Sequence, residues 1–88
     1  MSMHFPCLCC GYRTLEEEPG GTFEICPVCF WEDDNLQARD PTYAGGANKV
    51  SLQEARTNFA RMGAKSTMSL PVVRPPEAEE APPVQPWE

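Results

Sequence analysis

Alternation of apolar and polar positions in the first third of the chain predicts a β-hairpin. Segments 12–15 and 22–25 contain β-branched and aromatic residues, and their side chains alternate in polarity. Between them, Pro19-Gly20-Gly21 is a strong turn signal. We therefore expect the two segments to pair with each other. The side chains expected to contribute to packing are Tyr12, Leu15, Phe23 and Ile25.

Farther along the chain, the apolar positions change to the spacing of a helix, which predicts one amphipathic helix over residues 52–62. Ser51 and Glu54 have the spacing of a capping box at its start. Gly63 stands where a C-terminal cap belongs. Residues 39–48, which precede the helix, form a loop by composition. The apolar face of the helix consists of Leu52, Ala55, Phe59 and Met62.

Composition divides the 88-residue chain into two parts, because six of its ten prolines lie at or after Pro71. Residues 72–88 are rich in Pro and Glu and cannot bury enough apolar surface to offset the entropy of ordering. The expected domains are a cysteine-rich zinc-binding domain over residues 1–63 and a disordered tail over residues 64–88. A body this small is marginal without a metal or disulfides.

All five cysteines lie within residues 7–29, and their spacing predicts a metal site. Two C-x2-C pairs are separated by fifteen residues, within the range typical of zinc sites. Four thiolates suit tetrahedral Zn²⁺ in a closed structural site, and the same sulfur set also takes iron. The odd number of cysteines and the lack of a secretory signal argue against a disulfide framework. The predicted ligands of one Zn²⁺ are Cys7, Cys10, Cys26 and Cys29.

One alternative stays open at the first pair, because a tighter C-x-C choice makes Cys9 the second ligand. Cys10 is preferred, since Gly11 follows it and the second pair has the same spacing. Cys9 is then a small buried apolar residue or a free thiol. His4 can in principle replace a cysteine, but a lone histidine near a terminus is more often solvated.

Charge narrows the class of partner. The net charge is −6, and residues 1–63 hold nine acids and five bases, which gives −4. Four thiolates with Zn²⁺ add about −2 more. Such a surface favours a protein partner with a basic surface and disfavours nucleic acid, whose phosphates are bound by Lys and Arg. No apolar run is long enough to cross a membrane, and the N-terminus lacks a signal-peptide pattern, so we expect a cytoplasmic location.

An enzyme is not expected. The one histidine is His4, no Ser/His/Asp arrangement is present, and a four-thiolate site has no open coordination position. The function expected from the residues is a zinc-stabilised module for protein–protein interaction, with an immunity or antitoxin-like protein as one version. Two alternatives stay open, a rubredoxin-like iron protein for electron transfer and a nucleic-acid-binding zinc ribbon.

Four long motifs lie within residues 5–60. They are Phe5-Pro6-Cys7-Leu8-Cys9-Cys10-Gly11-Tyr12, Glu24-Ile25-Cys26-Pro27-Val28-Cys29-Phe30-Trp31-Glu32-Asp33-Asp34, Arg39-Asp40-Pro41-Thr42-Tyr43-Ala44-Gly45-Gly46-Ala47-Asn48 and Ser51-Leu52-Glu54-Ala55-Arg56. Together these motifs resemble the cysteine-rich CPCC family. The resemblance implies small bacterial proteins with a zinc-ribbon-like or rubredoxin-like centre, and it implies no activity. The fold class expected is therefore small metal-stabilised α+β, with β-hairpin knuckles followed by one α-helix. One departure is Leu8, which stands where the family's C-P-C-C motif has proline.

Overall fold

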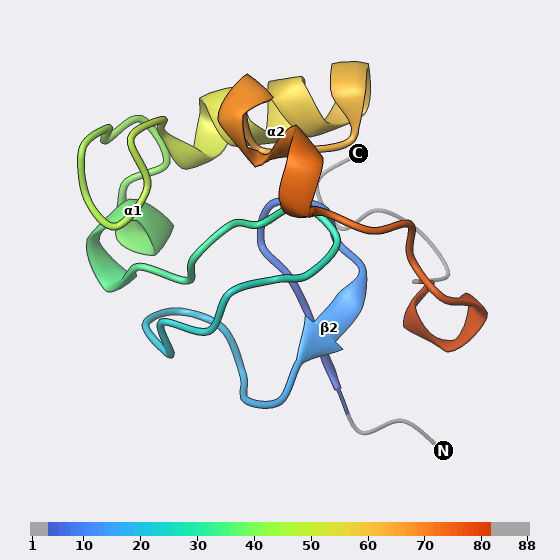
Figure 1. Ribbon diagram of the computed structural model, residues 1–88. Helices are drawn as coiled ribbons and strands as arrows, with labels where there is room; N and C mark the ends of the chain where they lie inside the picture. The colour runs from blue at the N-terminus through green and yellow to red at the C-terminus, as the bar shows by residue number, and fades with distance from the viewer. Residues whose placement is uncertain (1–3, 82–88) are drawn as a thin grey trace.

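The computed structural model describes residues 4–81 and contains six short elements joined by long loops (Figure 1). None of the helices in this described part is long and apolar enough to cross a membrane. The elements, in chain order, are strands β1 (Phe5–Pro6) and β2 (Arg13–Leu15), helices α1 (Asn35–Arg39) and α2 (Leu52–Met62), and the 3-10 helices η1 (Thr67–Val72) and η2 (Ala78–Glu80). This is a small α+β arrangement around a cluster of cysteines, as the sequence led us to expect.

The predicted pairing of segments 12–15 and 22–25 is wrong, because each segment pairs across its own cysteine turn. Strand β2 runs antiparallel to β1, with Phe5 opposite Leu15. Segment 22–25 pairs forward instead, through a bridge between Ile25 and Glu32. Each C-x2-C turn reverses the chain within a few residues, so the flanks of one cysteine pair meet at a low entropic cost of loop closure. The fold therefore holds two short hairpins, one for each cysteine pair.

This pairing changes which side chains are buried. Leu15 is buried, whereas Phe23 and Ile25 are each 49% exposed, because segment 22–25 does not cover the first hairpin. Tyr12 packs edge-on against Phe59 of α2, with 6.1 Å between ring centroids. Half of the ten residues in the core are cysteines. These ten are Cys7, Cys9, Cys10, Leu15, Cys26, Val28, Cys29, Trp31, Leu52 and Ala55.

The predicted helix over residues 52–62 is confirmed, including both of its caps. The Ser51 hydroxyl accepts from the N–H of Glu54 at 3.0 Å. Gly63 adopts a left-handed conformation with φ of 86°, in which glycine avoids the steric cost of a side chain. Leu52 faces the core, and the guanidinium of Arg56 donates to the carbonyl of Leu8 at 2.8 Å. These contacts attach α2 to the first cysteine turn.

The acid run after the second cysteine pair is buried in part. Asp33 and Asp34 are only 1% and 6% exposed. Asp34 caps α1 by accepting from the N–H groups of Leu36 and Gln37. Its second carboxylate oxygen accepts from Ala47, and these hydrogen bonds lower the pKa of Asp34 below its usual range.

Segment 64–81 differs from the disordered tail that composition predicted. Ala64 is fully buried, and the N–H of Lys65 donates to the carbonyl of Cys29 at 2.9 Å. The backbone N–H of Arg74 donates to the carbonyl of Pro27 at 3.1 Å. The guanidinium of Arg74 forms an ion pair with the carboxylate of Glu80 at 2.7 Å. The prediction of a disordered tail rested on average composition, which does not reveal contacts between particular residues. Residues 82–88, the remainder of the predicted tail, lie outside the described residues.

Truncation after Gly63 tests where the domain ends. We expect a lower free energy of unfolding, by about 2–4 kcal/mol, because buried apolar contacts and several hydrogen bonds are lost. Urea unfolding followed by circular dichroism measures the change. Truncation after Ala81 is the matched control and should leave the transition unchanged. Equal stability of the full chain and the chain ending at Gly63 would show that segment 64–81 contributes nothing to folding.

Candidate metal centre

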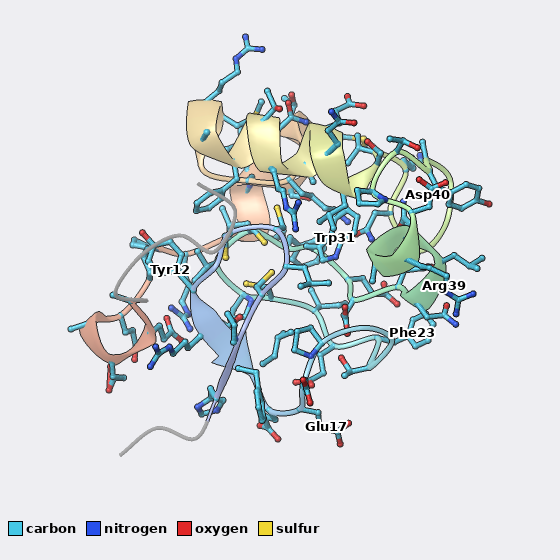
Figure 2. The ribbon with its side chains drawn as sticks, turned by 180° about the vertical axis from the view of Figure 1, so that it is seen from behind. Tyr12, Glu17, Phe23, Trp31, Arg39 and Asp40 are labelled. Atoms are coloured by element: carbon cyan, nitrogen blue, oxygen red, sulfur yellow. The ribbon has the colours of Figure 1, made fainter. Side chains whose placement is uncertain are left out.

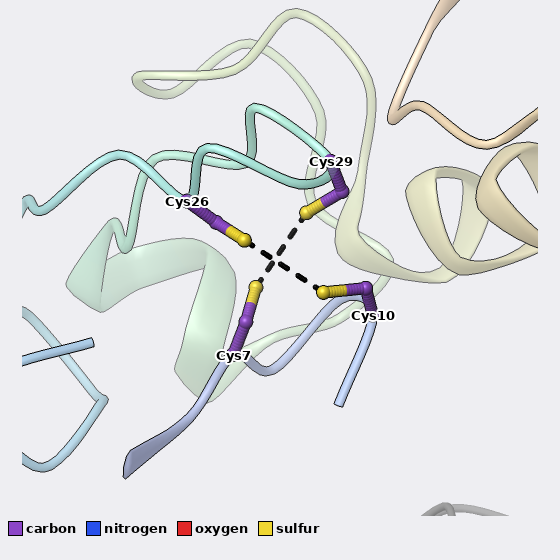
Figure 3. Close-up of side chains that lie close together, drawn as sticks. All are labelled: Cys7, Cys10, Cys26 and Cys29. Carbon is purple, nitrogen blue, oxygen red and sulfur yellow. Dashed lines mark hydrogen bonds between the residues drawn. The ribbon is translucent and has the colours of Figure 1, made fainter. Parts of the chain in front are cut away.

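The sulfur atoms of the four predicted ligands converge on one buried point (Figure 3). All four lie within 4.8 Å of one another. Cys7 Sγ lies 3.6 Å from Cys29 Sγ, and Cys10 Sγ lies 3.7 Å from Cys26 Sγ. A tetrahedron with a metal–sulfur distance of about 2.3 Å has sulfur–sulfur edges of about 3.8 Å. These separations fit a tetrahedral ion, and they are far longer than the roughly 2.0 Å of a disulfide bond.

Two cysteine turns with the same backbone bonding present these sulfurs. In the first knuckle, residues 7–12, the N–H of Cys7 donates to the carbonyl of Tyr12 at 2.9 Å. The N–H of Gly11 donates to the carbonyl of Cys7 at 2.8 Å. The second knuckle, residues 26–31, repeats both hydrogen bonds. The N–H of Cys26 donates to the carbonyl of Trp31 at 3.0 Å, and the N–H of Phe30 donates to the carbonyl of Cys26 at 2.7 Å. The repeated turn explains why two pairs of equal spacing present their sulfurs in the same way.

The residue after the second cysteine of each knuckle has a left-handed backbone. Gly11 adopts φ of 82° and Phe30 adopts φ of 71°. Glycine takes this conformation without strain, whereas a residue with a side chain incurs about 1–2 kcal/mol. The second knuckle therefore holds a strained phenylalanine at the position where the first has glycine. The ring of Phe30 lies 5.5 Å from the ammonium of Lys65.

Hydrogen bonds from outside the cluster reach three of the four sulfurs. The N–H of Cys9 donates to Cys7 Sγ at 3.4 Å, and that of Trp31 donates to Cys29 Sγ at 3.4 Å. The hydroxyl of Thr14 donates to Cys26 Sγ at 3.0 Å. Donors aimed at sulfur favour the thiolate, which is the form that binds a metal.

The protonation of the cluster follows from this crowding. Hydrogen bonds from Cys10 and its neighbours lower the pKa of Cys26, whereas donation to Cys26 raises the pKa of Cys10. Burial raises the pKa of Cys29. Buried thiolates so close together repel one another, so full ionisation needs a cation among them. Binding of such a cation would release protons from the remaining thiols.

The alternative ligands lie elsewhere. Cys9 is buried in the core at 1% exposure, but its sulfur is not part of the converging group, whereas that of Cys10 is. His4 is exposed and also lies outside the group. The structure thus brings together the four cysteines of the two C-x2-C pairs.

A buried network of hydrogen-bonded polar side chains beside the second knuckle was not predicted from the sequence. The Gln37 side chain donates to the carbonyls of Tyr43, Asn48 and Val50 at 2.9–3.1 Å. Asn48 exchanges hydrogen bonds with the backbone of Glu32 at 2.8 and 2.9 Å. Gln37 and Asn48 thereby hold loop 40–50 against the second knuckle. The signal that pointed here was the 39–48 motif, whose composition indicates a loop but not the contacts that anchor it.

A family model matches most of the chain. The family model described as "Cysteine-rich CPCC" matches residues 5–80. The match includes both knuckles and α2, and it continues through most of the segment that packs on the body after α2. No curated protein matches the chain.

Thr14→Val tests whether the hydroxyl bond supports metal binding. Loss of the donor to Cys26 Sγ should weaken metal affinity by about 10- to 100-fold, the usual effect of removing a group that orients a ligand. Competition with a chromophoric chelator measures the affinity. Thr57→Val removes a hydroxyl from the exposed side of α2 and is the matched control. An unchanged affinity in Thr14→Val would show that the bond is incidental.

Proposed function

The chain belongs to the cysteine-rich CPCC family, and we propose that it is a non-enzymatic zinc module that binds another protein. The observation that carries the proposal is the buried group of four cysteine sulfurs with separations suited to a tetrahedral ion. Cys7, Cys10, Cys26 and Cys29 are its ligands. The ion neutralises buried thiolates and ties the two knuckles together.

Zinc is proposed over iron because the fifteen-residue separation of the two C-x2-C pairs is typical of zinc sites. The site is also closed. All four cysteines are at most 1% exposed, so the site offers no access for substrate. Iron in the same sulfur set would make the chain a rubredoxin-like electron carrier, which is the alternative. The donors to three sulfurs favour this alternative too, since hydrogen bonds to sulfur tune the potential of an iron centre. Metal analysis separates the two.

The acidic surface supports a partner with a basic surface. Glu16, Glu17 and Glu18 are all exposed in the loop after β2. The carboxylate of Glu24 accepts from the N–H groups of Glu16 and Glu17 at 2.8 and 3.0 Å, which fixes the loop that presents these acids. A fixed acidic loop on a chain of net charge −6 attracts a basic protein and repels nucleic acid. An immunity or antitoxin-like protein that covers a basic toxin enzyme is one form of this proposal.

The free cysteines fit a reducing, cytoplasmic compartment.

Cys10→Ser and Cys9→Ser together test the metal site. We expect one zinc per chain in the wild type and in Cys9→Ser, and loss of the metal with unfolding in Cys10→Ser. Metal binding of about 10–16 kcal/mol matches or exceeds the whole net stability of a small domain. Native mass spectrometry and elemental analysis measure the metal, and a red colour with one iron would favour the electron carrier. Metal loss in Cys9→Ser alone would move the site to Cys9.

A charge variant tests the acidic surface. Simultaneous substitution of Glu16, Glu17 and Glu18 by Gln should weaken capture of a basic partner from the source organism, with metal content unchanged. Substitution of Glu77 and Glu79, exposed acids in and beside η2, is the matched control. Quantitative mass spectrometry of the captured proteins reads out the effect. Capture of acidic proteins alone, or equal capture by both variants, would contradict a role for this loop.

A further inference from the structure

A groove of about 430 Å³ lies beside the second knuckle and is lined by three separate segments. Phe30 comes from the knuckle, Lys49 and Val50 come from the loop before α2, and Lys65 and Met68 come from the segment after it. Its size lies within the roughly 300–1,000 Å³ of small-ligand and peptide-anchor pockets. The groove does not include the acidic loop 16–18.

Both lysines of this acidic chain line the groove. Lys49 is exposed. Lys65 is half-buried, and its ammonium donates to the side chain of Asn48 at 2.8 Å. An ammonium carries three donors, and among residues 4–81 no carboxylate forms an ion pair with either lysine. Glu32 and the ionised thiols of Cys29 and Cys9 attract the Lys65 ammonium only at longer range. The groove is therefore a positive site on a negative molecule.

Apolar side chains form the walls between these charges. Met68 is 81% exposed although its side chain is apolar. Methionine is flexible and is common on binding surfaces. Phe30 keeps a strained left-handed backbone while its ring faces Lys65. Strain of this kind is concentrated at functional sites, and a glycine here would remove it. Because glycine would form this turn without strain, we infer that the aromatic ring at position 30 serves binding rather than the turn itself.

We propose that the groove binds an acidic segment of a partner protein. Carboxylates of the segment pair with Lys49 and Lys65, and a large apolar side chain beside them packs against Phe30. Charge-assisted bonds between ammonium and carboxylate supply the polar part of the recognition. A nucleic acid fits poorly, because two lysines on a chain of net charge −6 cannot offset repulsion of a phosphate backbone.

The groove is built on the metal centre, so the two sites are linked. Phe30 follows Cys29 directly, and the N–H of Lys65 donates to the carbonyl of Cys29 at 2.9 Å. Loss of the ion would displace both residues. This inference goes beyond the basic partner proposed above, since it names a second surface with the opposite charge preference.

An array of short synthetic peptides, probed with the purified full-length chain, tests the proposal. The array varies acidic, basic, neutral and aromatic content, and the strongest signals should come from peptides that combine Asp or Glu with an aromatic residue. For the best peptide, Lys49→Gln and Lys65→Gln should each weaken binding by about two- to fivefold in fluorescence anisotropy, and together by about tenfold. Arg61→Gln, an equal charge change at an exposed site on α2, should leave binding unchanged.

Phe30→Gly supplies a second variant that keeps the backbone conformation of the knuckle and removes the aromatic wall. It should retain the metal and the thermal transition while it weakens peptide binding. Retained metal with lost peptide binding separates failure of the groove from failure of the metal site.

Several outcomes would overturn the proposal. These are a preference for basic or neutral peptides, equal weakening by Arg61→Gln, lysine-dependent binding of RNA or inorganic phosphate in place of peptide, and dimers of the chain that bury the groove.

Discussion

The structure depends on one constraint, which is that four cysteine sulfurs share a buried point without forming disulfide bonds. Each is at most 1% exposed, and neighbouring thiolates in such a place repel strongly. A cation bound among the thiolates would turn this repulsion into attraction. Half of the ten core residues are cysteines, so the apolar contacts that remain are few for a chain of this length.

The other elements take their positions from this cluster. Figure 2, which views the molecule from behind, shows the side chains gathered around the sulfurs, with Tyr12 and Trp31 among those labelled. Strands β1 and β2 flank the first knuckle, and α2 is tied to it through Arg56. The second knuckle anchors segment 64–81 through the carbonyls of Pro27 and Cys29. The proposed groove is built on that same anchoring.

The sequence predicts what is decided locally. The spacing of the cysteines identifies the four sulfurs that converge, since each pair is set by a turn of a few residues. Helix α2 follows from its apolar spacing and from the caps at Ser51 and Gly63. Each cysteine turn, like the helix with its two caps, is set by residues that are close together in the sequence.

Features that depend on distant partners could not be predicted in this way. Alternating polarity marks segments 12–15 and 22–25 as extended but does not say which strand each joins. The burial of Asp33 depends on three N–H groups of residues 20–22, which donate to its carboxylate at 2.8–2.9 Å. The hydroxyl of Thr14 and the ammonium of Lys65 acquire their roles only when the knuckles are assembled.

Unfolding measured before and after exhaustive chelation tests the central claim most directly. The account predicts that removal of the ion abolishes the cooperative transition and that one equivalent of Zn²⁺ restores it. A chain that stays compact and unfolds cooperatively after chelation, with no bound metal detected at any stage, would contradict the account.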